Sequence, residues 1–190
     1  MVSETPAIAE KKQEDLANSA TSISGNSSPQ SRETSASQLR LRKDLAALDL
    51  PPNVKIDATA LESDHRLYIQ VTPDEGYYKD GTFKFQAVFK DTYPIEPPKV
   101  TLIPVVYHPN IDLQGNVCLN ILREDWSPVL DVQSIIIGLL MLLLEPNATD
   151  PLNKTAAEAL RTNPSIFQSQ VASAMRGGYL QGLRYDRIAS

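Results

Sequence analysis

The sequence predicts an α+β domain that follows a tail without regular structure. A chain of 190 residues has room for one domain of usual size and a tail. Hydrophobic residues make up 42% of the chain and charged residues 22%, close to globular averages, so a sizeable core can be buried. Along the chain, one amphipathic helix is followed by strands, a long irregular segment and further helices. This order of elements is typical of α+β domains.

The tail is predicted from its composition. Residues 1–34 are rich in Ser, Thr, Ala, Glu and Gln, whereas all seven Tyr, four Phe and the one Trp lie at or after Tyr68. Such a segment buries too little apolar surface to offset the entropy that it loses on ordering. We therefore expect residues 1–34 to be a disordered tail and residues 35–190 to form the domain.

The first helix is predicted to start at Ser35, because Ser35 and Gln38 fit a capping box. The residues that follow place apolar side chains on one helix face, at Leu41, Leu45 and Leu48. Pro51 and Pro52 then end the helix, since proline offers no amide donor. The segment therefore reads as one amphipathic helix at the start of the domain.

Strand signals come next. Apolar and polar residues alternate over 67–72 and again over 83–89, and a shorter strand is predicted over 99–103. Asp80 and Gly81 stand just before the second strand, where a tight turn would connect it to the first. The prolines between Tyr93 and Pro98 predict an extended, stiff connection to the third. We expect a meander of antiparallel strands.

The second half of the domain is predicted to be irregular and then helical. Residues 105–129 show no sustained period, and long irregular segments inside compact domains tend to be functional. Asp131 can cap a helix that is apolar nearly all round from Ile135 to Leu144 and that Pro146 closes, as suits a core helix. Further helices are predicted over 153–161 and 164–176, with Gly177 as a left-handed stop.

Composition disfavours several kinds of function. Eighteen Lys and Arg against 23 Asp and Glu give a net charge of −5, the wrong sign for holding phosphate backbones. The most apolar stretch, residues 135–144, has about half of the ~20 residues that cross a bilayer. The single cysteine, Cys118, forms no intramolecular disulfide, and the first residues lack the pattern of a secretory signal. We expect a reducing, intracellular compartment and no nucleic acid, membrane, metal or cofactor.

Cys118 lies in the irregular segment, in a block that runs from His108 to Leu122. A lone cysteine is more often a small buried hydrophobe than a nucleophile. A cysteine hydrolase would need a base beside the sulfur and a third group to orient that base. Only His65 and His108 are available for this role, so the support for a hydrolase is thin.

The block resembles the active-site motif of the ubiquitin-conjugating enzyme family, in which His-Pro-Asn precedes the active cysteine. Asn110 and Cys118 are eight positions apart, as in that family. The resemblance extends to three further motifs: Tyr93-Pro-x-x-Pro-Pro98, Trp126-Ser-Pro128 and Pro146-Asn-x-x-Asp-Pro-Leu152. Within the family, four segments look like the members that conjugate the Nedd/Rub modifier: residues 74–78, 109–126, 150–154 and 177–179.

The resemblance implies a fold and a reaction. The fold would have an N-terminal helix, a four-stranded antiparallel meander, a long irregular active-site segment, and central and C-terminal helices. Cys118 would accept a Nedd/Rub-type modifier as a thioester and pass it to a substrate lysine. Asp150 would orient the amine and receive its proton. Asn110 has two roles open, a hydrogen bond to the oxyanion or pinning of the loop, and His108 and Pro109 are assigned structural roles.

The resemblance also implies partners. The edge that binds RING-type ligases in the family is matched by Ile95, Ser127 and Pro128. The basic helix face that meets the heterodimeric activating enzyme is matched by Arg40, Arg42 and Lys43. Arg123 matches a position that clasps the modifier or the ligase, although an exposed loop arginine is usually just solvated. Cullin-type substrates and a location in cytoplasm and nucleus are expected on the same grounds.

Two other interpretations of the same fold stay open. One is a conjugating enzyme specific for ubiquitin, and the other is a catalytically silent module that positions a modifier for a partner enzyme. Cys118 in its full motif, with Asn110 eight residues earlier, argues for an enzyme. Asn120 stands where ubiquitin-type members commonly carry Asp, which favours a different modifier.

Overall fold

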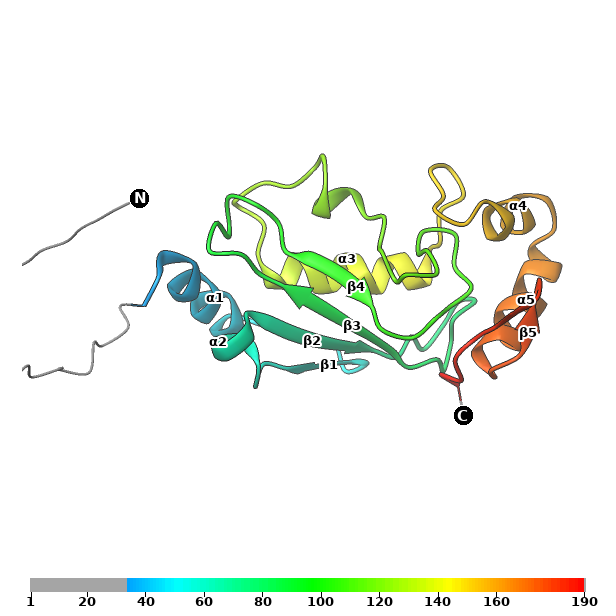
Figure 1. Ribbon diagram of the computed structural model, residues 1–190, viewed down its shortest axis with the longest axis horizontal. Coiled ribbons are helices and arrows are strands. Elements are labelled where there is room, and N and C mark those ends of the chain that lie inside the picture. Colours follow the sequence, from blue (N-terminus) through cyan, green and yellow to red (C-terminus); the bar gives the residue numbers. More distant parts are fainter. Residues whose placement is uncertain (1–33, 190) are drawn as a thin grey trace, which may run out of the picture. The chain divides into compact units, whose positions relative to one another are not determined.

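The computed structural model describes residues 34–189, and Figure 1 shows how their helices and strands are arranged. The predicted disordered tail, residues 1–34, lies outside the described residues except for Thr34, so this boundary stays a prediction. Within residues 34–189, no helix has both the length and the apolar character that a membrane crossing requires.

The first helix starts as the sequence predicts, but it ends at Ala46, before Leu48 and the two prolines that were expected to end it. Helix α1 (Ala36–Ala46) starts at the predicted capping box, in which Ser35 and Gln38 bond each other's backbone. The main sheet is an antiparallel meander in the order β1-β2-β3-β4. Its strands are β1 (Val54–Asp57), β2 (Arg66–Val71), β3 (Phe83–Val88) and β4 (Lys99–Leu102). Residue alternation predicted β2, β3 and β4, and the family resemblance supplied the count of four, whereas the position of β1 was missed.

Helix α3 (Val132–Leu144) crosses the sheet and supplies one side of the core (Figure 1). Asp131 caps it as predicted, with its carboxylate accepting the Ser134 amide at 2.8 Å. The helix lies in the core as predicted, with Ile135, Ile136, Leu139, Leu142 and Leu143 buried. Its apolar character extends beyond the buried face, since Ile137 and Met141 are 39% and 42% exposed.

Two predicted connections differ from the structure. The link from β2 to β3 is not a tight turn: it is a loop over residues 72–82 that carries Tyr78 into the core, where its hydroxyl donates to the Tyr107 carbonyl. The segment 93–98 is not extended, because Tyr93 and Ile95 donate their amides to turn carbonyls three residues earlier. Proline fixes a φ that a turn accepts as readily as an extended chain does, and the burial of Tyr93 selects the turn.

The C-terminal region contains the two predicted helices, α4 (Lys154–Thr162) and α5 (Pro164–Met175). Gly177 follows α5 in the left-handed region with φ +81°. The sequence pattern missed the short helix α2 (Leu61–Asp64) and the final hairpin of β5 (Tyr179–Leu180) and β6 (Leu183–Arg184). These elements are too short for hydrophobic periodicity to reveal them.

The long segment between β4 and α3 is irregular, as predicted, apart from one 3-10 turn over Asn120–Leu122. It is fastened to the sheet at Gly115, whose carbonyl accepts the Leu102 amide at 2.8 Å. A Cβ atom on Gly115 would lie 2.0 Å from the Leu102 carbonyl oxygen, and its φ of +79° also disfavours any side chain. Glycine at this position therefore lets the segment meet β4.

Replacing Gly115 by alanine should lower the free energy of unfolding by about 3 kcal/mol or more, since it adds a backbone clash to the left-handed strain. Gly182 is the matched control: it has the same φ of +79°, but no atom lies within 4 Å of the position that a Cβ would take. Gly182→Ala should cost only about 1 kcal/mol. Urea unfolding of the two variants measures the difference, and equal losses would contradict the clash.

Candidate active site

The structure brings the three predicted catalytic residues to one groove. Cys118, Asn110 and Asp150 line a hollow of about 260 Å³ that opens beside α3. Cys118 comes from the irregular segment, and Asp150 comes from the loop between α3 and α4. The position of these residues is therefore set by two stretches without regular structure.

The sulfur of Cys118 is largely buried, with the residue 8% exposed. The Nη1 atom of Arg123 donates to this sulfur at 3.1 Å. That hydrogen bond raises the pKa of Arg123, and the negative charge of Asp150 adds a smaller effect in the same direction. The sequence allows two roles for Arg123, contact with a partner or simple solvation, and the structure places its positive charge at the sulfur.

Asn110 holds the loop that carries Asp150. Its Nδ2 donates to the Asn147 carbonyl at 2.8 Å, and its Oδ1 accepts the Asn147 amide at 2.8 Å. Its own carbonyl accepts the Cys118 amide at 2.8 Å. Pinning of the loop is therefore visible in the structure. The side-chain amide has a second N–H, so pinning of the loop and donation to an oxyanion would use different hydrogen atoms of Asn110.

His108 holds the backbone of Asn110 by a hydrogen bond. It is fully buried, stacks on Tyr78 with ring centroids 4.8 Å apart, and accepts the Asn110 amide at Nδ1. Its Nε2 lies 3.0 Å from the Leu142 carbonyl, so the neutral ring carries its proton on Nε2. Burial lowers the pKa of His108 to about 4. The structural role predicted for this histidine agrees with these contacts.

The loop with Asp150 has a second attachment. The amides of Leu152 and Asn153 both donate to the Pro109 carbonyl at 2.9 Å. Because Pro109 and Asn110 are adjacent, the loop is tied on both sides of Asp150 to the same short stretch of chain. The Asp150 carboxylate itself is exposed at the edge of the groove, where an incoming amine can reach it.

Sequence reasoning missed several residues that line the groove. The apolar ones are Leu119, Ile121, Met141 and Leu142, and the polar or charged ones are Asn120, Glu145 and Asn147. Gly138 on α3 permits this arrangement, since a Cβ there would lie 2.6 Å from the Cδ1 atom of Ile121. A glycine inside an otherwise apolar helix was the available sequence signal for a close approach. The groove therefore places the Cys118 sulfur beside a wall that is apolar in part. Its lining, within residues 34–189, includes no histidine, so the hydrolase interpretation lacks its base.

The predicted ligase-binding residues lie on one edge, which we call the docking edge: Ile95, Ser127 and Pro128. Ile95 is 74% exposed. The two loops that carry these residues are joined because the Trp126 Nε1 donates to the Pro94 carbonyl at 3.0 Å. Trp126 is half-buried, and through this bond it links the two loops.

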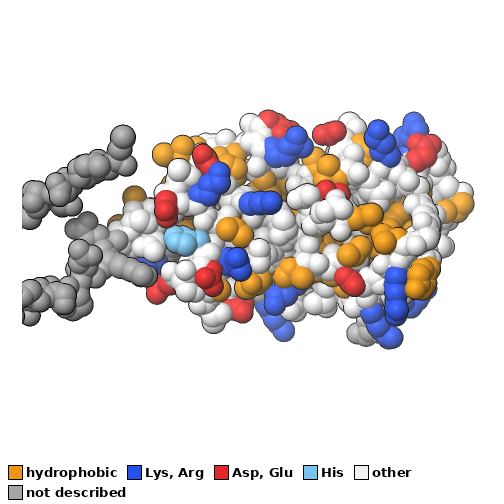
Figure 2. All heavy atoms as spheres, in the orientation of Figure 1, with side chains coloured by type: hydrophobic (Ala, Val, Ile, Leu, Met, Phe, Trp, Pro, Cys, Tyr) orange, Lys and Arg blue, Asp and Glu red, His pale blue; other side chains and the backbone are white. Residues whose placement is uncertain are grey.

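The three basic residues of α1 do not share one exposed face. Arg42 pairs with Glu62 at 2.7 Å on the surface, and Lys43 has no ion pair within the described part of the chain. Arg40 instead turns inward to Asp44 and is 23% exposed. Figure 2 shows basic and acidic side chains interspersed over the visible face, with no large patch of one sign.

Comparison with known proteins agrees with this fold and site. The model of the ubiquitin-conjugating enzyme family matches residues 40–175. The chain therefore belongs to the ubiquitin-conjugating enzyme family, and it is a transferase with a cysteine thioester intermediate.

The similar proteins include members of the family that are named for the modifier NEDD8. The chain is 51% identical to NEDD8-conjugating enzyme UBC12 of Eremothecium gossypii over 154 residues, which are 81% of this chain and 84% of that protein. It is 52% identical to Nedd8-conjugating enzyme UbcE2M of Drosophila melanogaster over 149 residues, 78% of this chain and 82% of that protein. The solved structure of S. cerevisiae Ubc12 superposes with a TM-score of 0.79 at 51% identity, covering 83% of this chain and 88% of the other.

Replacing Asn110 by alanine should lower the free energy of unfolding by about 1 to 3 kcal/mol, because two backbone groups of Asn147 lose their partner. Hydrogen exchange at the Asn147 amide should quicken at the same time. Asn116→Ala is the control, since this exposed side chain bonds only Asp112 and its loss should cost less than about 0.5 kcal/mol. Unchanged stability and exchange in Asn110→Ala would refute the pinning role.

Proposed function

We propose that this protein accepts a Nedd8-type modifier as a thioester on Cys118 and transfers it to a lysine of a substrate protein. The observation that carries the proposal is the groove in which Cys118, Asn110 and Asp150 meet. The identity of about one half to proteins named as NEDD8-conjugating enzymes in fungi and in Drosophila supports the choice of modifier.

The first step is thiol exchange. The sulfur of Cys118 attacks the carbonyl of the thioester that joins the modifier to the activating enzyme. The cysteine sulfur of the activating enzyme leaves as a thiolate. The guanidinium of Arg123, 3.1 Å from the Cys118 sulfur, lies where it can stabilise the negative charge of the attacking form. No amine takes part in this step, so Asp150 has no role in it.

The second step is attack by a lysine amine on the same carbonyl. The new C–N bond forms, the C–S bond breaks, and Cys118 leaves as a thiolate, which needs no general acid. The difficulty lies with the nucleophile: a lysine of pKa about 10.4 is neutral only to about one part in 10^3.4 at pH 7, a handicap of roughly 4.6 kcal/mol. The Asp150 carboxylate at the groove edge can orient the amine and receive its proton.

The hollow beside Cys118 suits the modifier's end of the thioester. Leu119, Ile121 and Met141 give it apolar lining, on which an extended peptide end can lie. Gly138 lets Ile121 and Leu119 pack directly on α3, which fixes this side of the hollow. The hollow and the exposed Asp150 edge offer separate approaches for the modifier and for the substrate lysine.

The partners follow from the surfaces. We assign the activating enzyme, a heterodimer, to the α1 face with Arg42 and Lys43, and a RING-type ligase with a cullin substrate to the docking edge. Ile95 is 74% exposed, so its side chain is accessible to a partner at this edge. A free catalytic thiol functions in a reducing compartment, which supports cytoplasm and nucleus as the location.

Two alternatives make different predictions in one assay. A ubiquitin-specific enzyme would be loaded by ubiquitin and not by Nedd8, and a silent module would be loaded by neither. The protein is mixed with activating enzyme, ATP and each purified modifier, and the products are run on gels with and without reductant. A reductant-sensitive adduct with Nedd8 alone supports the proposal, and an adduct with ubiquitin alone refutes the assigned modifier.

Replacing Cys118 by serine should turn the labile thioester into an oxygen ester that survives reductant. The reason is that an alkoxide is a far worse leaving group than a thiolate, and Cys118 is the only cysteine in the chain. Denaturing gels with and without reductant measure the change, with the wild-type protein as control. If Cys118→Ser still gave an adduct that reductant releases, another group would be the nucleophile.

Replacing Asp150 by alanine should slow discharge to lysine by about a hundredfold near pH 7, a typical contribution of a positioned base. The defect should shrink as pH rises toward about 10, where free amine is abundant. Loading should stay as in wild type, because that step involves no amine. Discharge rates from about pH 7 to pH 10 decide: a defect of constant size would indicate lost orientation, and no defect would leave Asp150 without a role.

A further inference from the structure

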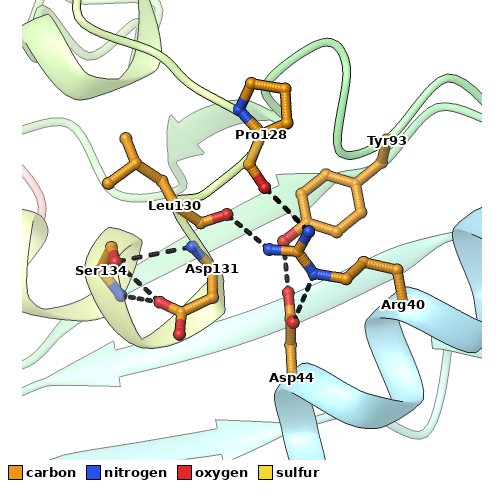
Figure 3. A network of polar contacts seen from close by, with 7 residues as sticks. All are labelled: Arg40, Asp44, Tyr93, Pro128, Leu130, Asp131 and Ser134. Atoms are coloured by element: carbon orange, nitrogen blue, oxygen red, sulfur yellow. Dashed lines mark hydrogen bonds and ion pairs between the residues drawn. The ribbon is translucent and has the colours of Figure 1, made fainter.

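Arg40 is held inside the domain by every nitrogen of its guanidinium (Figure 3). Nε donates to the Asp44 carboxylate at 2.7 Å, Nη1 to the Pro128 carbonyl at 2.8 Å and Nη2 to the Leu130 carbonyl at 2.8 Å. The guanidinium carbon also lies 5.7 Å from the centre of the Tyr93 ring. Helix α1 is thereby fastened to the loop that precedes α3 and carries part of the docking edge.

The same network reaches the other loop of the docking edge. The second oxygen of Asp44 accepts the Tyr93 hydroxyl at 2.5 Å. Tyr93 is 2% exposed, and its ring lies 6.0 Å from the Trp126 ring. Burial, followed by the bond to Asp44, raises the pKa of Tyr93, so its hydroxyl remains a donor at all ordinary pH values. The indole N–H of Trp126 donates to the Pro94 carbonyl, so the network of contacts extends to the residue next to Ile95.

The network depends on the shape of arginine. The Asp44 side chain is 5% exposed, so loss of its cation would leave a carboxylate in a poorly solvated site. Two loop carbonyls would lose their donors as well. A lysine keeps the charge, but its single ammonium cannot reproduce the planar fork that reaches three acceptors in different directions.

We propose that Arg40 is a positioning residue for the ligase step: it holds residues 93–98 and 126–130 in one arrangement so that Ile95, Ser127 and Pro128 form a single docking surface. This inference rests on the proposed function, in which that surface receives a RING-type ligase. It removes Arg40 from the face that meets the activating enzyme. Arg42 and Lys43 remain on that face.

The contrast with Arg42 supports this division. Arg42 is 57% exposed and pairs with Glu62, which is 76% exposed, so the pair can open toward a partner at little cost. Arg40 would have to abandon Asp44, Pro128 and Leu130 to do the same. Two basic residues on one helix are thus predicted to act in different steps of the reaction.

The test compares Arg40→Lys and Tyr93→Phe with Arg42→Ala. Tyr93→Phe removes only the hydroxyl bond to Asp44 and leaves the charges of α1 as they are, so it separates the network from any charge effect. Two measurements are made: hydrogen exchange of the free protein, and discharge of preloaded protein at increasing concentrations of a purified RING domain. The ratio of stimulated to unassisted discharge is followed for each variant.

In Arg40→Lys and Tyr93→Phe, amides in 93–98 and 126–130 should exchange faster while those of β2 and β3 do not. The half-saturating RING concentration should rise about tenfold, which is the loss expected for one misplaced docking loop, and the discharge rate at saturation should recover. Arg42→Ala should slow loading and leave the half-saturating concentration as in wild type.

Opposite results overturn the inference. If Arg40→Lys loaded the modifier slowly, while hydrogen exchange in the loops and the half-saturating RING concentration stayed as in wild type, Arg40 would belong to the surface that binds the activating enzyme. Equal acceleration of exchange in the loops and in β2 and β3 would show a general loss of stability instead of positioning. Loading of the wild-type protein tests the proposed function separately, since wild-type protein that fails to load Nedd8 would refute it. Hydrogen exchange in the free variants would still decide the role of Arg40.

Discussion

Both loops of the active site are fastened to Pro109 and Asn110, and the geometry of the site depends on this attachment. Neither the Cys118 segment nor the Asp150 loop belongs to a strand or a long helix, and the Cys118 segment has only isolated antiparallel bridges such as Ile111 with Val117. The Asn110 carbonyl takes the Cys118 amide, its side chain takes both backbone groups of Asn147, and the Pro109 carbonyl takes two amides beyond Asp150. A buried, neutral His108 holds this anchor against α3, and a charged residue in its place would require burial of an uncompensated ion.

The chemistry explains why so few ionisable groups surround the sulfur. A thiolate departs without a general acid, so the groove needs no histidine beside Cys118 and can use its surroundings for other purposes. Arg123 places a positive charge at the sulfur, and the Asp150 carboxylate lies at the exposed edge. In the proposed reaction these two charges of opposite sign act at its two ends, the sulfur that leaves and the amine that arrives.

The predictable parts of the structure are those whose signals are local. The caps at Ser35 and Asp131 and the alternation in β2 and β3 depend on neighbouring residues, so the sequence indicates them directly. The grouping of Cys118, Asn110 and Asp150 was predicted from the resemblance to the motifs of the ubiquitin-conjugating enzyme family. The turn at 93–98 and the exposed stripe of α3 were missed, because they depend on where the sheet ends and on how Tyr93 is buried. The role of Gly138 likewise depends on a contact with Ile121 in a different segment.

Arg40 shows why a cluster of charges in a sequence is a weak guide to a binding face. Arg40 and Arg42 are two positions apart, so on a helix they point about 200° apart around the axis. One of them must face inward if the other faces solvent, and the inward one finds acceptors at Pro128 and Leu130, far along the chain. The positive charge of Arg40 is then neutralised by the ion pair with Asp44, and it contributes little to the electrostatic attraction of a partner protein. The attractive charge of α1 therefore consists of Arg42 and Lys43, and Arg40 acts on partners only through the shape of the loops that it holds.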